Sequence, residues 1–188
     1  FSDSNYNYFL SRIRNDWCPH CEILAYCLMP NHFHLMIQAT ESSCIEIPSY
    51  GGKPMQLLAR KIGLTLSSYA QHINRQNKTT GSLFQQKTKA KCISTPETGQ
   101  TTLRRGPTVS TPSYIINCMH YIHQNPWRAN LVTKMEDWQY SSFLSYASIK
   151  EDHLCNREIL MNLTRYDFNQ FLKDSYLAIE DSDIYFKW

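Results

Sequence analysis

Residues 22–39, EILAYCLMPNHFHLMIQA, decide the fold of this 188-residue chain. The first half is a dense apolar run, which predicts a buried strand over residues 22–29. The second half alternates between two strand faces, because neighbouring side chains point to opposite sides. One face is apolar and carries Phe33, Leu35 and Ile37. The other face carries His32, His34, Met36 and Gln38. Pro30-Asn31 between the halves is a turn signal, so the stretch predicts a β-hairpin.

The segments before and after this hairpin have the residue spacing of helices. Residues 5–15 predict a short helix, and apolar residues three or four apart predict the clearest helix over residues 54–75. Pro112 can open a third helix, which we expect to end just before Asn125 because Pro126 disfavours a helical conformation at the residue that precedes it. These elements predict an α+β fold, a mostly antiparallel sheet with helices packed on it in the ferredoxin-like or RRM-like manner.

The rest of the chain carries weaker signals. Residues 83–94 indicate a strand, and residues 95–112, rich in Thr, Pro and Gly, indicate a flexible loop or insertion. Beyond residue 137, aromatic residues recur in short helical pieces. We therefore expect a catalytic or binding domain over residues 1–145 and a helical C-terminal extension over 146–188.

Composition excludes several classes of protein. Apolar residues make up 42% and charged residues 19% of the chain, which is unlike a disordered or coiled-coil sequence. The apolar run of the first strand stops at Pro30, far short of a membrane span, so no membrane partner is expected. A net charge of +3 permits a polyanionic partner without requiring one. Seven scattered cysteines indicate free thiols in a reducing compartment.

Trp17-Cys18-Pro19-His20-Cys21 has the W-C-x-x-C pattern of a thioredoxin-type redox centre. In that fold the motif follows a strand and opens a helix, whose N-terminus lowers the pKa of the first thiol. Here a helix pattern precedes the motif and a strand pattern follows it. A connection with two reduced thiols is therefore favoured over a redox centre, and also over half of a zinc site.

Two further patterns carry candidate chemistry. His32 and His34 lie two apart on one strand and therefore present two imidazoles side by side, as a metal ion requires, although an isolated pair is more often an ordinary feature of a sheet. Asn117, Tyr121 and Asn125 are spaced by four, which places a phenol and two amides on one helix face opposite an apolar face.

Basic residues form a third pattern, suited either to a solvated surface or to tracking a phosphate backbone. They are Lys87, Lys89 and Lys91 on the predicted strand, Arg104 and Arg105 in the loop, and Arg128 after the polar helix.

Three strings together resemble the REP-associated tyrosine transposases of the single-tyrosine HUH transposase superfamily of bacterial insertion sequences. The strings are AYCLMPNHFHL (25–35), GSLFQ (81–85) and YIHQNPWRA (121–129), in the family's order and spacing. The family usually begins with a strand that carries a tyrosine-histidine string. Nothing in this sequence matches that strand. Either the strand is missing and the sheet loses one member, or it precedes Phe1, because a first residue other than Met indicates that the sequence begins inside a longer polypeptide.

The resemblance implies roles for four residues. His32 and His34 match the two histidines of the HUH motif, Tyr121 matches the nucleophilic tyrosine, and Asn125 matches the amide that completes the metal site. It also implies Mg²⁺ or Mn²⁺, whereas imidazole ligands by themselves favour zinc-like ions. The implied enzyme cuts one DNA strand, leaves a 5′-phosphotyrosine link and a free 3′-hydroxyl, and rejoins strands by the reverse step.

We therefore expect a metal-dependent DNA strand transferase that acts on single-stranded DNA at hairpin-forming repeats. The family implies a cytoplasmic, nucleoid-associated bacterial protein that is a monomer or a homodimer. Two alternatives stay open, a domesticated protein that binds hairpin DNA without cutting it, and a thiol oxidoreductase centred on Cys18 and Cys21.

Overall fold

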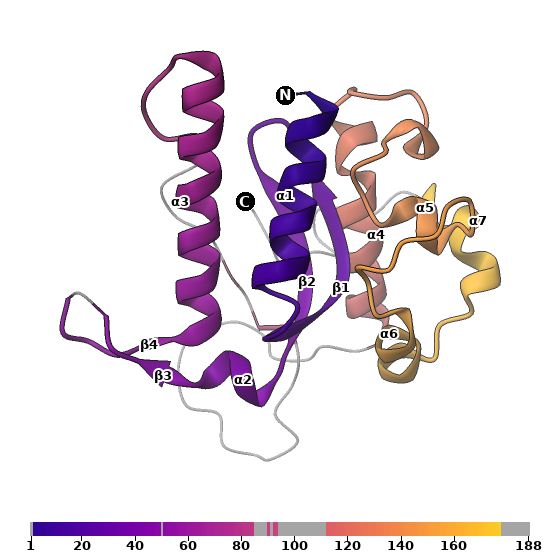
Figure 1. Ribbon diagram of the computed structural model, residues 1–188. Coiled ribbons are helices and arrows are strands. Elements are labelled where there is room, and N and C mark those ends of the chain that lie inside the picture. Colours follow the sequence, from indigo (N-terminus) through magenta and orange to yellow (C-terminus); the bar gives the residue numbers. More distant parts are fainter. Residues whose placement is uncertain (1, 50, 85–89, 91, 94–111, 178–188) are drawn as a thin grey trace.

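The computed structural model describes residues 2–49, 51–84, 90, 92–93 and 112–177. It confirms the α+β class, with helices packed on an antiparallel sheet (Figure 1). In chain order the elements are α1 (Asp3–Asp16), β1 (Cys21–Leu28), β2 (Phe33–Ala39), α2 (Glu41–Cys44), β3 (Glu46–Ile47), β4 (Met55–Gln56), α3 (Leu57–Asn77), α4 (Pro112–Arg128), η1 (Met135–Asp137), α5 (Phe143–Tyr146), α6 (Arg157–Thr164), η2 (Phe168–Gln170) and α7 (Phe171–Ser175).

The predicted hairpin is the centre of the fold. β1 pairs antiparallel with β2, with Leu28 opposite Phe33 and Cys27 opposite His34. The two predicted faces of β2 are confirmed, because Phe33 packs in one core whereas Met36 is buried in the other. The two connected strands therefore fix which side of the sheet the histidines occupy.

A β-bulge interrupts β1 near its start. Ile23 pairs with Ile37 and Ala25 with Met36, so Leu24 is an extra residue on β1. A bulge changes the alternation of side chains along its strand. Accordingly Ile23 lies in one core, while Leu24 and Ala25 both lie in the other. The bulge places two adjacent apolar side chains in the core that α4 shares with the C-terminal elements.

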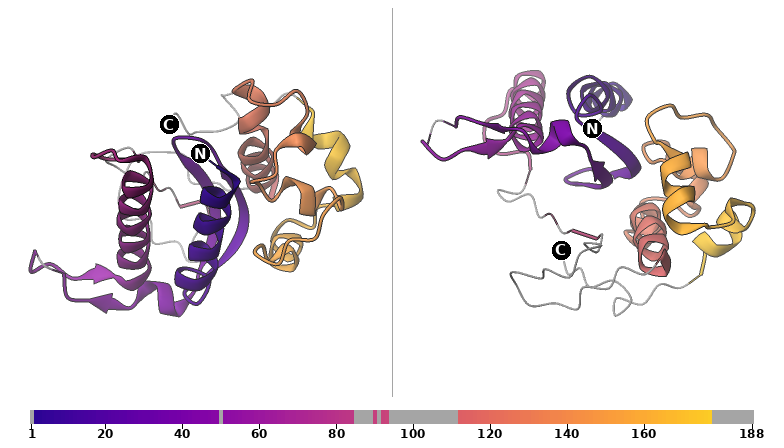
Figure 2. Two further views of the ribbon diagram at one scale, coloured as in Figure 1. Left: turned by 45° about the horizontal axis from the view of Figure 1, so that its top comes forward. Right: turned by 90° about the horizontal axis from the view of Figure 1, so that it is seen from below.

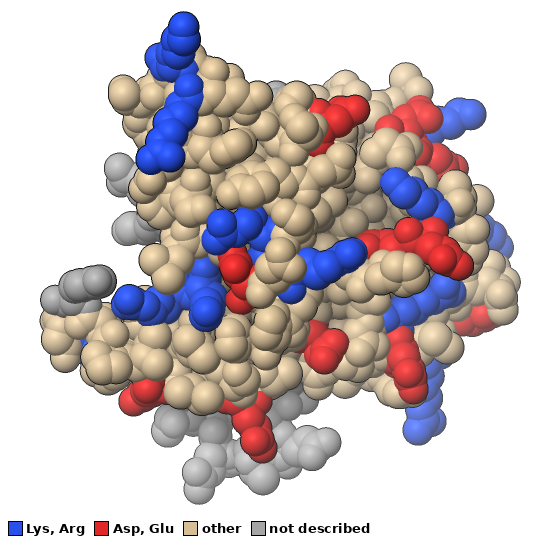
Figure 3. Space-filling model, in the orientation of Figure 1, with Lys and Arg blue, Asp and Glu red and all other residues tan. Residues whose placement is uncertain are grey.

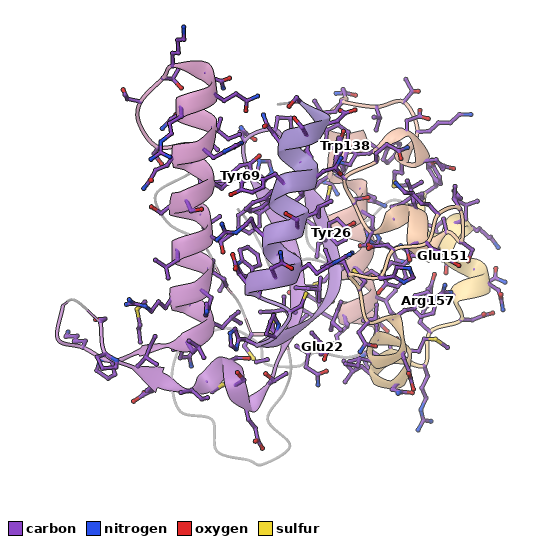
Figure 4. The ribbon with its side chains drawn as sticks, in the orientation of Figure 1. Glu22, Tyr26, Tyr69, Trp138, Glu151 and Arg157 are labelled. Carbon is purple, nitrogen blue, oxygen red and sulfur yellow. The ribbon has the colours of Figure 1, made fainter. Side chains whose placement is uncertain are left out.

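Helices cover both faces of the hairpin. Seen from below in Figure 2, α1 and α3 lie on one side and α4 with the C-terminal helices on the other. Trp17, at the end of α1, is buried and donates its indole N–H to Thr65 Oγ1 of α3 at 3.0 Å. Tyr69 of α3 turns toward α1 (Figure 4) and donates its hydroxyl to the carbonyl of Asn5 at 3.2 Å. Aromatic packing and these two bonds join α1 to α3.

The second core lies between β1, α4 and the C-terminal elements. Met119 and Ile122 of α4 are buried against this face of the hairpin, and Phe143 and Phe171 cover α4 from the other side with no exposed surface. The short helical pieces expected after residue 137 are confirmed. The expected domain limit at residue 145 falls inside α5, an element of this core.

The sequence prediction of α4 was wrong at its end. The helix continues past Asn125 to Arg128, with Pro126 inside it. Proline has no N–H for the carbonyl of Ile122, four residues earlier. The side-chain amide of Asn125 compensates, because its Nδ2 donates to the carbonyl of Tyr121 at 2.7 Å and to that of Ile122 at 3.4 Å. A side-chain hydrogen bond thus replaces the backbone hydrogen bond to the Ile122 carbonyl that proline removes.

Three other details refine the sequence reading. The long helix α3 spans residues 57–77 rather than 54–75, and the two-residue strands β3 and β4 before it were not predicted. Of the strand expected over residues 83–94, the described residues Leu83, Phe84 and Ile93 are in no strand, and most of the others lie outside the described residues. None of the helices that the structure describes has the length and apolar character to cross a membrane.

Candidate active site

The two histidines of the hairpin lie beside each other as the strand pattern predicts. The ring centroids of His32 and His34 are 4.8 Å apart, with the rings perpendicular. His32 lies just before β2 and is half-buried, whereas His34 lies within β2 and is buried. His34 lies opposite Cys27 of β1, on the face of the hairpin that α4 covers.

Burial sets the charge of this pair. It lowers the pKa of His34 to about 4, assisted by the neighbouring His32, and it also lowers the pKa of His32. Both imidazoles are therefore neutral near pH 7. Neutral imidazole is the form that binds a metal ion, since a protonated ring has no lone pair to donate.

Asn31 fixes the hydrogen position on His32. The Nδ1 atom of His32 lies 2.6 Å from Oδ1 of Asn31. A carboxamide oxygen only accepts hydrogen bonds, so Nδ1 carries the hydrogen and Nε2 keeps the lone pair. Such a bond to the second ring nitrogen is the usual way to orient a histidine ligand.

Tyr121 comes to this pair from a distant part of the chain. Its half-buried ring meets the ring of His34 edge to face, with centroids 6.2 Å apart. The guanidinium carbon of Arg128, two helical turns later, lies 5.1 Å from the centroid of the Tyr121 ring. A cation over the ring stabilises the aromatic face and places positive charge beside the phenol.

Asn125 lies one turn after Tyr121 on the same face of α4. Because its Nδ2 is engaged by two backbone carbonyls, its Oδ1 is the atom available to accept a cation. The structure thus brings His34 and Tyr121 into ring contact and places Asn125 on the next turn. Neutral imidazoles and amide oxygens are donor types that a divalent cation accepts.

The predicted basic residues are placed only in part. Arg128 is exposed and lies on Tyr121. The other five lie outside the described residues; they are Lys87, Lys89, Lys91, Arg104 and Arg105.

Sequence reasoning missed two buried histidines on the core side of α4. His123 has its Nε2 2.7 Å from Oγ of Ser142, and Nδ1 of His120 lies 3.0 Å from Oγ of Ser175. Burial lowers the pKa of His120 to about 4, and it also lowers the pKa of His123. Their serine partners are 19 and 55 residues away in sequence, so no local pattern could reveal these bonds. His120 ties the helix of Tyr121 to the C-terminal extension, whereas His123 ties it to Ser142, just before that extension.

The W-C-x-x-C motif connects α1 to β1, in the inverted order that the sequence indicates. Burial raises the pKa of Cys18, and it raises the pKa of Cys21 to about 12. A reactive thiol requires the opposite shift, because the thiolate is the nucleophile. The motif lacks the electrostatics of a redox centre.

Among the described residues, no three His, Cys, Asp or Glu side chains are grouped so as to hold a metal ion. Comparison of the chain with protein-family models, curated proteins and solved structures gave no match.

Proposed function

We propose that this protein cleaves and rejoins single-stranded DNA at hairpin-forming repeats through a 5′-phosphotyrosine intermediate, as the resemblance to the REP-associated tyrosine transposases implies. The observation that carries the proposal is the ring contact of Tyr121 in α4 with His34 in β2, whose ring in turn lies beside that of His32. The contact joins a candidate nucleophile to a candidate cation site, which neither motif achieves alone.

Each residue has a distinct task in this chemistry. The Oη atom of Tyr121 attacks the phosphorus, forming a P–O bond and losing its proton, while the bond from phosphorus to the 3′-oxygen breaks and that oxygen takes up a proton. Attack by the freed 3′-hydroxyl on the phosphotyrosine reverses the step. Arg128 places positive charge beside the phenol, which favours its deprotonation and the binding of a phosphate.

His32, His34 and Asn125 would hold the divalent cation, Mg²⁺ or Mn²⁺. When bound, this ion would polarise the scissile phosphate and offset the charge that develops on it. Asn31 orients the ring of His32, and the carbonyls of Tyr121 and Ile122 orient the amide of Asn125. These bonds fix the orientation of two of the three candidate ligands.

The test is a denaturing gel of the full-length protein incubated with single-stranded DNA that carries candidate hairpin repeats, in Mg²⁺ or Mn²⁺. We expect a protein–DNA adduct that survives denaturation. Tyr121→Phe should abolish the adduct while hairpin binding persists. Tyr114→Phe, on the same helix two turns earlier, is the matched control and should keep the adduct.

The metal ligands are tested separately by calorimetry. His34→Ala should lose both cation binding and cleavage, with partial rescue at high cation concentration, and Asn125→Ala should give an intermediate loss because water can replace a neutral amide. Binding of hairpin DNA by the wild type without any adduct would identify the non-cutting alternative. An adduct that persists in Tyr121→Phe would show that the site is assigned to the wrong tyrosine.

The same proposal covers the biological setting. Its partner is single-stranded or hairpin DNA, its location is the bacterial cytoplasm with the nucleoid, and its active form is a monomer or a homodimer.

A further inference from the structure

Basic and acidic residues are concentrated in different parts of this chain, which the net charge of +3 does not reveal. Between Glu46 and Glu136 there are twelve lysines and arginines and a single acid, Glu97, while the remaining residues hold seven basic and fifteen acidic side chains. The long helix α3 lies in the basic segment and contains no acidic residue. Figure 3 shows basic side chains toward both ends of this helix.

The outward side of α3 forms a single stripe, which we call the α3 stripe. Its members are spaced by three or four and are half-buried or exposed; they are Arg60, Leu64, Ser67, Gln71, Arg75 and, at the C-cap, Lys78. All but Leu64 can donate a hydrogen bond. The stripe is about 27 Å long at 1.5 Å per residue.

We propose that the α3 stripe binds the phosphate backbone of a DNA duplex, namely the stem of the hairpin. This inference rests on the proposed function and adds a second contact surface to it. About 27 Å corresponds to roughly eight base-pair steps of B-DNA at 3.4 Å per strand, so a straight helix can follow one stem. Phosphate contacts of this kind position a protein on DNA without reading its sequence.

Two observations favour a duplex over a single strand as the occupant. Single strands are held by stacking on exposed aromatic rings. The stripe presents no such ring, and the one tyrosine of α3, Tyr69, is buried against α1. The stripe also lies on the side of the hairpin opposite α4, away from Tyr121 (Figure 2). The stem and the cleaved strand would therefore occupy different faces of the protein.

The experiment measures DNA affinity against salt for the full-length chain. The variant is Arg75→Gln with Lys78→Gln, which removes the charge of two exposed residues while keeping a polar side chain at each position. The matched control is Lys150→Gln with Lys173→Gln, which removes the same charge from exposed positions of the C-terminal extension. The probes are a DNA hairpin with a single-stranded flank, the flank alone, and an RNA hairpin of the same sequence.

Loss of two phosphate contacts should reduce the salt slope for the hairpin by about 1.8 and weaken its binding by roughly tenfold or more at 0.1 M salt. Binding of the flank alone, and the adduct formed on it, should not change. The control variant should behave as wild type.

Other results overturn the inference. These are an unchanged salt slope, an equal loss in the control variant, or tighter binding of the RNA hairpin than of the DNA hairpin. The outcome is separable from that of the proposed function. A wild type that forms no adduct but binds the hairpin through Arg75 and Lys78 refutes cleavage alone, and an adduct with an unchanged salt slope refutes the α3 stripe alone.

Discussion

Acidification should destabilise this protein well above the range in which carboxylates titrate. His34, His120 and His123 are buried, and burial lowers the pKa of all three, to about 4 for His34 and His120. In the unfolded chain each ring has a pKa of ~6.5. Below that pH the unfolded state binds more protons than the folded state, so stability falls as the pH falls.

The magnitude follows from the difference in proton binding. For a ring that stays neutral in the folded state, lowering the pH from 6.5 to 5.5 costs about 1 kcal/mol, and three such rings cost about 3 kcal/mol. Asp174 near His120 acts in the opposite direction but does not outweigh burial. The pKa of Asp16 is lowered, so its contribution is lost only at a more acidic pH. A loss of about 3 kcal/mol is a large share of a typical stability of roughly 5–15 kcal/mol.

The assay is urea unfolding, followed by tryptophan fluorescence at pH 6.5 and 5.5 and constant ionic strength. A chelator prevents stabilisation by cations. His34→Gln and His120→Gln should each reduce the pH-dependent loss by about 1 kcal/mol, whatever their effect on absolute stability. His153→Gln, exposed before α6, is the control and should retain the full loss. A wild-type difference below about 1 kcal/mol, or a full difference in both buried variants, would refute the reasoning.

Three further outcomes are expected. Ser142→Ala should lower the free energy of unfolding by about 2–4 kcal/mol in urea titration, because the buried hydroxyl bonds the N–H and the carbonyl of Tyr26 as well as His123. An effect below about 0.5 kcal/mol would contradict that network. Trp17→Phe should cost about 1–3 kcal/mol in the same titration, since the buried Thr65 hydroxyl loses its indole donor. Cys21 should resist alkylation by iodoacetamide at pH 8 in the folded state, as measured by mass spectrometry, because burial raises its pKa to about 12; rapid alkylation would contradict this.

Local sequence predicts the parts of this fold whose stability is local. The hairpin follows from alternation over residues 32–39 and from the Pro30-Asn31 turn, and α1, α3 and α4 follow from helical spacing. The histidine pair was predictable for the same reason, because side chains two residues apart along a strand point to the same face. The contact of Tyr121 with His34 was implied by the family resemblance and not by spacing, because it joins segments almost 90 residues apart.

The features that could not be predicted depend on residues far apart in the sequence or on side chains that replace a backbone hydrogen bond. The proline rule for α4 failed because the Asn125 amide bonds the carbonyl that Pro126 leaves without a donor. The bulge at Leu24 could not be recognised, because a continuous apolar run shows no alternation that an extra residue would interrupt. The strands β3 and β4 are two residues long, which is too short to show a period.

The Asn125-Pro126 pair restricts which residues evolution can place at this position. The side chain donates from Nδ2 to the carbonyls of Tyr121 and Ile122. Aspartate has the same length but cannot donate, so it would set a negative charge against two carbonyl oxygens. Glutamine has both groups but is one methylene longer, which moves the amide away from the turn. Asparagine is therefore nearly irreplaceable while Pro126 stays, and a substitution at Pro126 that restores the backbone N–H should make residue 125 more tolerant of change.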